Sequence, residues 1–75
     1  MIAEHDLVVL RRDLPEHGLE AGDVGVVVDC YDSDGYEVEF VNAAGETLAV
    51  LTLESQELRA MEGSEILHVR TVTAA

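Results

Sequence analysis

Apolar and polar residues along the chain follow patterns that are typical of short β-strands. The clearest alternation lies in residues 36–41, where Val38 and Phe40 share one face and Glu37 and Glu39 share the other. Runs rich in β-branched residues, separated by turn residues, recur at the spacing of a small all-β fold. The expected strands are residues 6–11, 23–31, 36–41, 46–53 and 58–61.

Turn residues separate these strands. Asp34-Gly35 is a strong hairpin signal, and Pro15 with Gly18 marks a long first loop. Gly22 can supply a positive φ, and Gly25 inside the second strand fits a bend or a close backbone approach. Residues 54–57 fit a short 3₁₀ turn before the last strand. The pattern predicts a small SH3-like β-barrel of five strands over residues 1–62.

The C-terminal residues 63–75 form a separate tail in this interpretation. A polar stretch ends the barrel, and residues 66–72 are strand-like in composition and carry His68 and Arg70. A one-turn helix at residues 64–67 is the alternative, although the β-branched residues that follow disfavour it. We expect a sixth strand that packs on the barrel or on a second subunit, because an uncovered apolar strand invites aggregation.

The charge balance limits the classes of partner. The chain has 16 acidic residues, four arginines and no lysine, for a net charge of −12. Binding to nucleic acid or to anionic membranes depends on basic side chains, so neither is expected as a partner. An acidic chain is drawn instead toward a basic protein surface, and the alternative is that the charge serves solubility alone.

No catalytic, cofactor or metal motif is apparent. The Asp32–Gly35 turn resembles part of a calcium loop, but Cys30 and Val41 occupy positions that require carboxylates. The histidines and the single cysteine lack the paired spacing of a zinc site, and the glycines form no phosphate-binding loop. One cysteine permits no internal disulfide, and no leader or membrane-spanning run is visible, so we expect a cytoplasmic protein.

Acidic residues concentrate in the hairpin between the second and third strands. This cluster is the candidate partner-binding site, because self-repelling carboxylates are tolerated when solvent or a cationic partner screens them. Its members lie within residues 29–39 and are Asp29, Asp32, Asp34, Glu37 and Glu39.

Five segments carry a resemblance to known proteins, and they are residues 5–10, 13–19, 22–25, 36–40 and 65–70. Together they resemble small bacterial proteins of domain-of-unknown-function family 4926. The resemblance covers nearly the whole chain and implies a compact SH3-like β-barrel, without an activity that could be carried over. A second resemblance, confined to residues 22–28, is to KOW and nitrile-hydratase β-subunit barrels.

The sequence thus favours a non-enzymatic, acidic protein-interaction module, such as an antitoxin, an inhibitor or an accessory subunit that binds a basic protein. The alternative is a structural subunit that forms a homodimer through its tail. A small enzyme is the third and weakest hypothesis.

Overall fold

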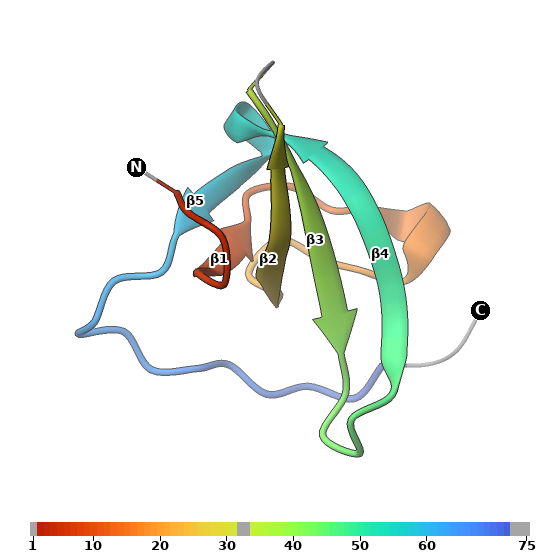
Figure 1. The fold of residues 1–75 in the computed structure, drawn as a ribbon. Helices are drawn as coiled ribbons and strands as arrows, with labels where there is room; N and C mark the ends of the chain where they lie inside the picture. The colour runs from red at the N-terminus through yellow and green to blue at the C-terminus, as the bar shows by residue number, and fades with distance from the viewer. Residues whose placement is uncertain (1, 32–33, 73–75) are drawn as a thin grey trace.

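The computed structural model describes residues 2–31 and 34–72 and forms one antiparallel sheet of five strands (Figure 1). The strand order is β4-β3-β2-β1-β5. Each strand boundary lies within one residue of the boundary expected from sequence, so the five-stranded all-β prediction is confirmed. The strands are β1 (Leu7–Leu10), β2 (Val24–Tyr31), β3 (Gly35–Val41), β4 (Thr47–Glu54) and β5 (Leu58–Ala60).

The sheet curls around its core without closing (Figure 1). Strands β4 and β5 are the two edges, and no ladder joins them. Two 3₁₀ turns complete the described structure: η1 (Pro15–His17) in the first loop, and η2 (Ser55–Glu57) between β4 and β5. The second turn lies where the sequence placed one, and the Glu57 side chain accepts a hydrogen bond from the Glu54 backbone N–H at its start.

The concave face of the sheet holds the hydrophobic core. In β3, Val38 and Phe40 are buried, as the alternation of the sequence predicts. In β4, Leu53 is buried and Leu51 is half-buried, while Val50 faces outward. The buried apolar side chains of this core cluster are Val8, Leu10, Leu14, Leu19, Val27, Val38, Phe40, Leu53 and Leu58.

Two glycines before and within β2 have the roles that the sequence predicted. Gly22 has a φ of +97°, a conformation that L side chains rarely adopt. A Cβ on Gly25 would lie 2.6 Å from Val38 Cγ1 and 2.8 Å from Phe40 Cε1. Core side chains therefore occupy the space of a side chain at Gly25, and the predicted close approach at this position is confirmed.

The C-terminal tail differs from the expectation. Residues 61–72 contain no strand and no helix, so the expected sixth strand on the barrel itself and the alternative helical turn are both wrong. Pairing of this segment with a second subunit stays a prediction. The described tail crosses beside the sheet as an extended strap (Figure 1). Side-chain ion pairs hold it, with Arg59 binding Glu65 and Arg70 binding Asp23. The tail has a strand-like composition but forms no strand, because ion pairs determine its path and no sheet ladder holds it.

Candidate protein-binding surface

A row of carboxylates lies on the convex face of β2 and β3. A register shift between Val27 and Asp29 adds one residue to β2, and Asp29 then lies directly opposite Glu37. Glu39 lies two residues further along β3, on the same face, opposite Val26. Asp29, Glu37 and Glu39 are called the acidic row below. Like charges directly opposite each other destabilise a sheet, so this arrangement costs the fold some stability.

Neutral hydroxyl groups orient the carboxylates of β3. Glu37 Oε1 accepts hydrogen bonds from the Tyr31 hydroxyl at 3.0 Å and from Thr52 Oγ1 at 2.8 Å. Glu39 Oε2 accepts one from Thr47 Oγ1 at 2.6 Å. The hydrogen bond to Glu37 raises the pKa of Tyr31 above its ordinary value. These contacts fix the side chains without neutralising their charge.

Of the other two predicted residues, Asp34 lies at the end of the hairpin between β2 and β3. Asp34, with a φ of 69°, accepts a hydrogen bond from Ser55 Oγ at 2.8 Å and thereby ties the hairpin to η2. Asp32 lies outside the described residues. The structure thus brings three of the five predicted residues onto one face and places a fourth at the end of the hairpin.

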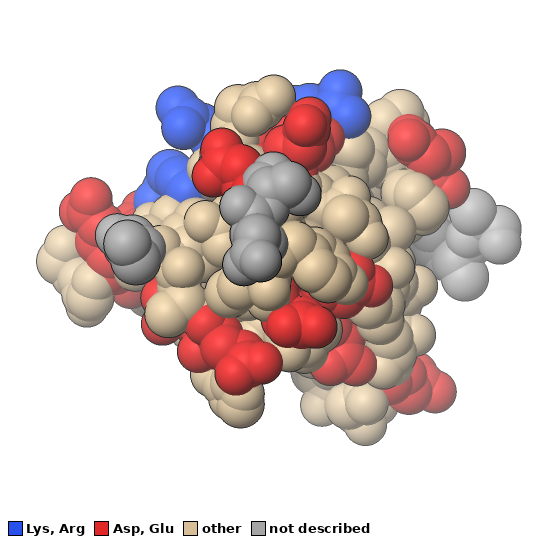
Figure 2. All heavy atoms as spheres, turned by 45° about the horizontal axis from the view of Figure 1, so that its top comes forward, with Lys and Arg blue, Asp and Glu red and all other residues tan. Residues whose placement is uncertain are grey.

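Arginines lie away from the acidic row. Arg12 binds Glu57 at 2.9 Å and Arg59 binds Glu65 at 2.7 Å. Figure 2 shows the blue arginine atoms along the upper edge of the molecule, with some red carboxylates beside them and others along the lower edge. Among residues 2–31 and 34–72, no ion pair involves a member of the acidic row.

Asp23 forms a second acidic centre, which the sequence analysis missed. Its side chain is buried, with 7% of the residue exposed. Arg70 donates from Nη2 to Asp23 Oδ2 at 2.5 Å and from Nε to Oδ1 at 2.8 Å, and His68 Nε2 lies 3.0 Å from Oδ1. Arg70 Nη2 also donates to the Gly18 carbonyl. The Glu20 backbone N–H completes the set of donors.

Burial and hydrogen bonding shift the pKa of Asp23 in opposite directions. Burial alone would raise the pKa of this carboxyl group. The hydrogen bonds from Arg70, the Glu20 backbone and His68 outweigh burial and lower the pKa of Asp23 to about 2. Asp23 therefore carries a full negative charge that its own chain neutralises. The sequence signal was the presence of Arg70 and His68 in a chain poor in basic residues. Their shared partner, 47 residues from Arg70 and 45 from His68, could not be inferred.

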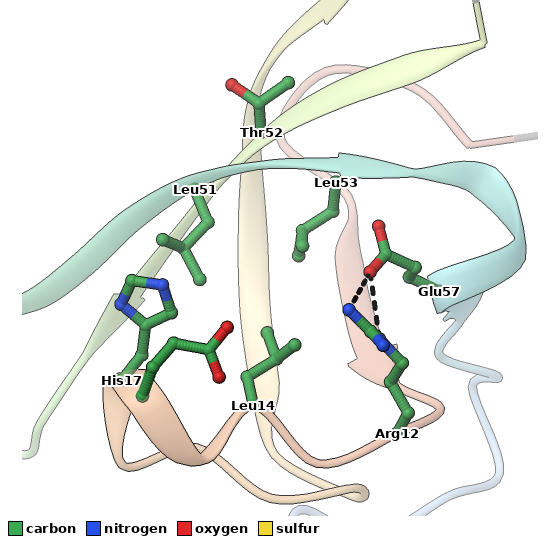
Figure 3. Close-up of a pocket in the computed structure, with 8 residues that line it drawn as sticks. Arg12, Leu14, His17, Leu51, Thr52, Leu53 and Glu57 are labelled. Carbon is green, nitrogen blue, oxygen red and sulfur yellow. Dashed lines mark hydrogen bonds and ion pairs between the residues drawn. The ribbon is translucent and has the colours of Figure 1, made fainter.

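A shallow groove lies beneath the free edge of β4. Leu51 and Leu53 point down from the strand toward Leu14 of the first loop, while Thr52 points to the opposite face (Figure 3). The groove has a volume of about 190 Å³. Its remaining lining comes from Arg12, Glu16, His17 and Glu57.

A larger hollow of about 530 Å³ lies between the tail and the sheet. Leu67, Val69 and Val72 line it from the tail, while Val26 and Val41 line it from the sheet. In the described part of the chain, no group of three or more histidine, cysteine or acidic side chains could hold a metal ion. No helix among the same residues is long and apolar enough to cross a membrane.

Comparison with known proteins identifies the family. The model of a domain of unknown function (DUF4926) matches residues 4–60. The chain belongs to this family. The DUF4926 match includes the acidic row, Asp23 and β4, and it ends before the tail, although the sequence resemblance extended to residue 70. No curated protein and no solved structure matches the chain.

Proposed function

We propose that the protein is a non-enzymatic interaction module that binds a basic surface of a partner protein through the acidic row. The observation that carries this proposal is the contrast between the two acidic centres. Asp23 is neutralised by Arg70, whereas Glu37 and Glu39 are held only by hydroxyl groups. Oriented, unneutralised carboxylates complement a cationic partner.

The energetics of the row support the same function. Asp29 and Glu37 face each other across a ladder and repel, yet both side chains reach solvent. A partner that supplies Lys or Arg side chains would relieve this repulsion on binding. The net charge of −12 would steer such a partner toward the surface and raise the association rate.

The proposal also covers the kind of interaction module, its architecture and its cellular compartment. An antitoxin, an inhibitor or an accessory subunit would each use a small acidic surface to mask a basic one. An SH3-like barrel is the architecture that the five-stranded curled sheet would support, and the cytoplasm is the compartment that the sequence favours. Nucleic acid and anionic membranes are expected to be repelled.

A homo-oligomeric structural subunit is the second candidate. Ile66 and Val69 in the tail are 92% and 93% exposed. Large apolar side chains at such exposure favour a covering surface, which a second copy could supply. Analytical ultracentrifugation over a wide concentration range separates the two candidates, because only the second requires self-association.

A matched pair of variants tests the first candidate. The wild-type protein, the Glu37→Gln/Glu39→Gln variant and the Glu4→Gln/Glu62→Gln variant would be used as baits in lysate of cells that produce the protein. Both variants lose two charges, but only the first alters the acidic row. A partner retained by the wild type and the control, and lost by Glu37→Gln/Glu39→Gln, is the expected result.

The retained partner would then be purified and its association rate measured at two salt concentrations. We expect the acidic-row variant to associate roughly tenfold more slowly at low salt, with little change in the dissociation rate. An association rate that is indifferent to salt and to both variants would contradict the proposal.

A further inference from the structure

The free edge of β4 is the longest unpaired strand edge in the described structure. β4 has eight residues and pairs only with β3, whereas the other edge strand, β5, has three. Among the described residues, no backbone hydrogen bond from residues 47–53 reaches any element other than β3. Backbone donors and acceptors that point away from β3 are therefore available to another strand.

The features that usually protect an edge strand are sparse in β4. Residues 47–53 read Thr-Leu-Ala-Val-Leu-Thr-Leu, with no charge, proline or glycine. Leu48 and Val50 expose 38% and 47% of their surfaces. A bulge near Thr47 and a charge at Glu54 interrupt the edge only at its two ends. A long apolar edge of this kind is suited to pairing with an added strand.

The two faces of β4 offer different surroundings to such a strand. On the concave side, the groove of about 190 Å³ lies under Leu51 and Leu53 and has Leu14 at its floor (Figure 3). Charged and polar side chains line the rest of it: Arg12, Glu16, His17 and Glu57. On the convex side, Thr52 and Val50 lie directly beside Glu37 and Glu39. Side chains of an added strand would alternate between Leu51 and Leu53 above this groove and the acidic row.

Charge identifies the occupant as a basic segment. An added strand would lie about 10 Å from β3, and the long side chains of Lys or Arg on its convex face would reach over β4 toward Glu37 and Glu39. A second copy of β4 fits poorly. Antiparallel self-pairing centred on Val50 would place Glu54 opposite Glu46 of the other copy and would join two chains of charge −12.

We infer that the free edge of β4 binds an extended segment of a basic partner protein by strand addition, with apolar side chains entering the groove and Lys or Arg side chains meeting the acidic row. The inference rests on the proposed function and specifies how the partner docks. Main-chain hydrogen bonds would supply affinity, and the alternating side chains would supply specificity.

A synthetic peptide provides the first test. It would have eight residues, the length of β4, with valine alternating with arginine and both ends capped. Two derivatives would carry N-methyl groups on all valine amides or on all arginine amides, which removes the donors from one edge of the strand only. We expect the parent peptide to bind and one derivative to bind at least about tenfold more weakly. Hydrogen exchange should slow at β4 amides that point away from β3.

Two outcomes of this test would overturn the inference. Equal binding of the parent and both methylated peptides, still reduced by Glu37→Gln/Glu39→Gln, would leave the acidic row as a docking surface and remove strand addition. Protection of β4 in concentrated protein without peptide, together with a dimeric mass, would show that a second copy occupies the edge.

A matched pair of protein variants provides the second test. Val50 and Val41 have nearly equal exposure, 47% and 48%, and both flank the row, but only Val50 lies on the edge strand. Val50→Lys would repel the arginines of an added strand, so we expect it to weaken peptide binding roughly tenfold more than Val41→Lys does. Equal weakening by the two variants would indicate attraction to the acidic row without strand addition and would overturn the inference.

Discussion

The two acidic centres of this protein differ in whether other groups of the chain neutralise their negative charge. Asp23 is buried and is surrounded by donors from Arg70, His68 and the Glu20 backbone, and it ties the tail to the sheet. Glu37 and Glu39 are partly exposed and accept hydrogen bonds from hydroxyl groups, and Glu37 faces Asp29 across the ladder. The first centre stabilises the fold, whereas the second costs stability and remains available for a partner. In a chain this acidic, a carboxylate that pairs with one of the few arginines is structural, and a carboxylate without such a partner is available for binding.

Removing the charge of Asp23 should have the largest effect on stability. Asp23→Asn leaves the guanidinium of Arg70 without its carboxylate at a site that is 7% exposed, and we expect a loss of about 3 kcal/mol. Urea denaturation followed by circular dichroism measures the loss. Glu20→Gln is the control, because Glu20 is exposed and lies 3.7 Å from Arg70. If both variants cost the same, Asp23 is an ordinary surface charge.

A double variant sharpens this prediction. Asp23→Asn combined with Arg70→Met removes both members of the buried ion pair, so neither member is left without the other. The combined cost should be clearly smaller than the sum of the two single costs. Additive costs would show that the two residues act independently.

Acid should weaken the same contact. The pKa of Asp23 is lowered from 3.8 to about 2, so its contribution is complete above about pH 4 and is lost as the pH falls toward 2. The shift corresponds to about 2 kcal/mol. The stability difference between the wild type and Asp23→Asn should therefore shrink over this range. A difference that stays constant from pH 5 to about pH 2 would contradict the assigned pKa.

Neutralising the acidic row should change the stability of the fold less than Asp23→Asn does, and in the opposite direction. In Glu37→Gln/Glu39→Gln the side-chain oxygens can still accept hydrogen bonds from Thr52 and Thr47, while the repulsion with Asp29 is removed. We expect unchanged stability or a gain of up to about 1 kcal/mol, largest at low salt. A loss of more than about 1 kcal/mol would mean that the row stabilises the fold, and the comparison between the two centres would fail.

The sequence predicted most of the sheet because its signals are local. Alternation in residues 36–41 identified the buried face of β3, and Gly25 marked the place where Phe40 and Val38 approach β2. The tail could not be predicted in the same way. Its path depends on an ion pair between Arg70 and Asp23, and strand-like composition gives no information about a contact over 47 residues.

Only part of the candidate site could be predicted from the sequence. The acidic side chains of the hairpin were recognisable, but the register shift beside Val27 that aligns Asp29 with Glu37 was not. The hydroxyl donors of Tyr31, Thr47 and Thr52 come from neighbouring strands, so their role depends on register. The free edge of β4 follows from the sheet remaining open, which no local pattern indicates.

The smallest effect is expected from the exposed ion pair between Arg59 and Glu65. Hydrogen bonds from Arg59 and from the Glu62 backbone lower the pKa of Glu65 to about 2, yet both side chains lie at the surface. Solvent and salt screen such a pair, so Glu65→Gln should leave the melting temperature unchanged within error. Its effect should be local, seen as faster hydrogen exchange or proteolysis within residues 61–66. If Glu65→Gln instead lowered stability as much as Asp23→Asn, anchoring of the tail would depend on its whole length and not on the buried carboxylate.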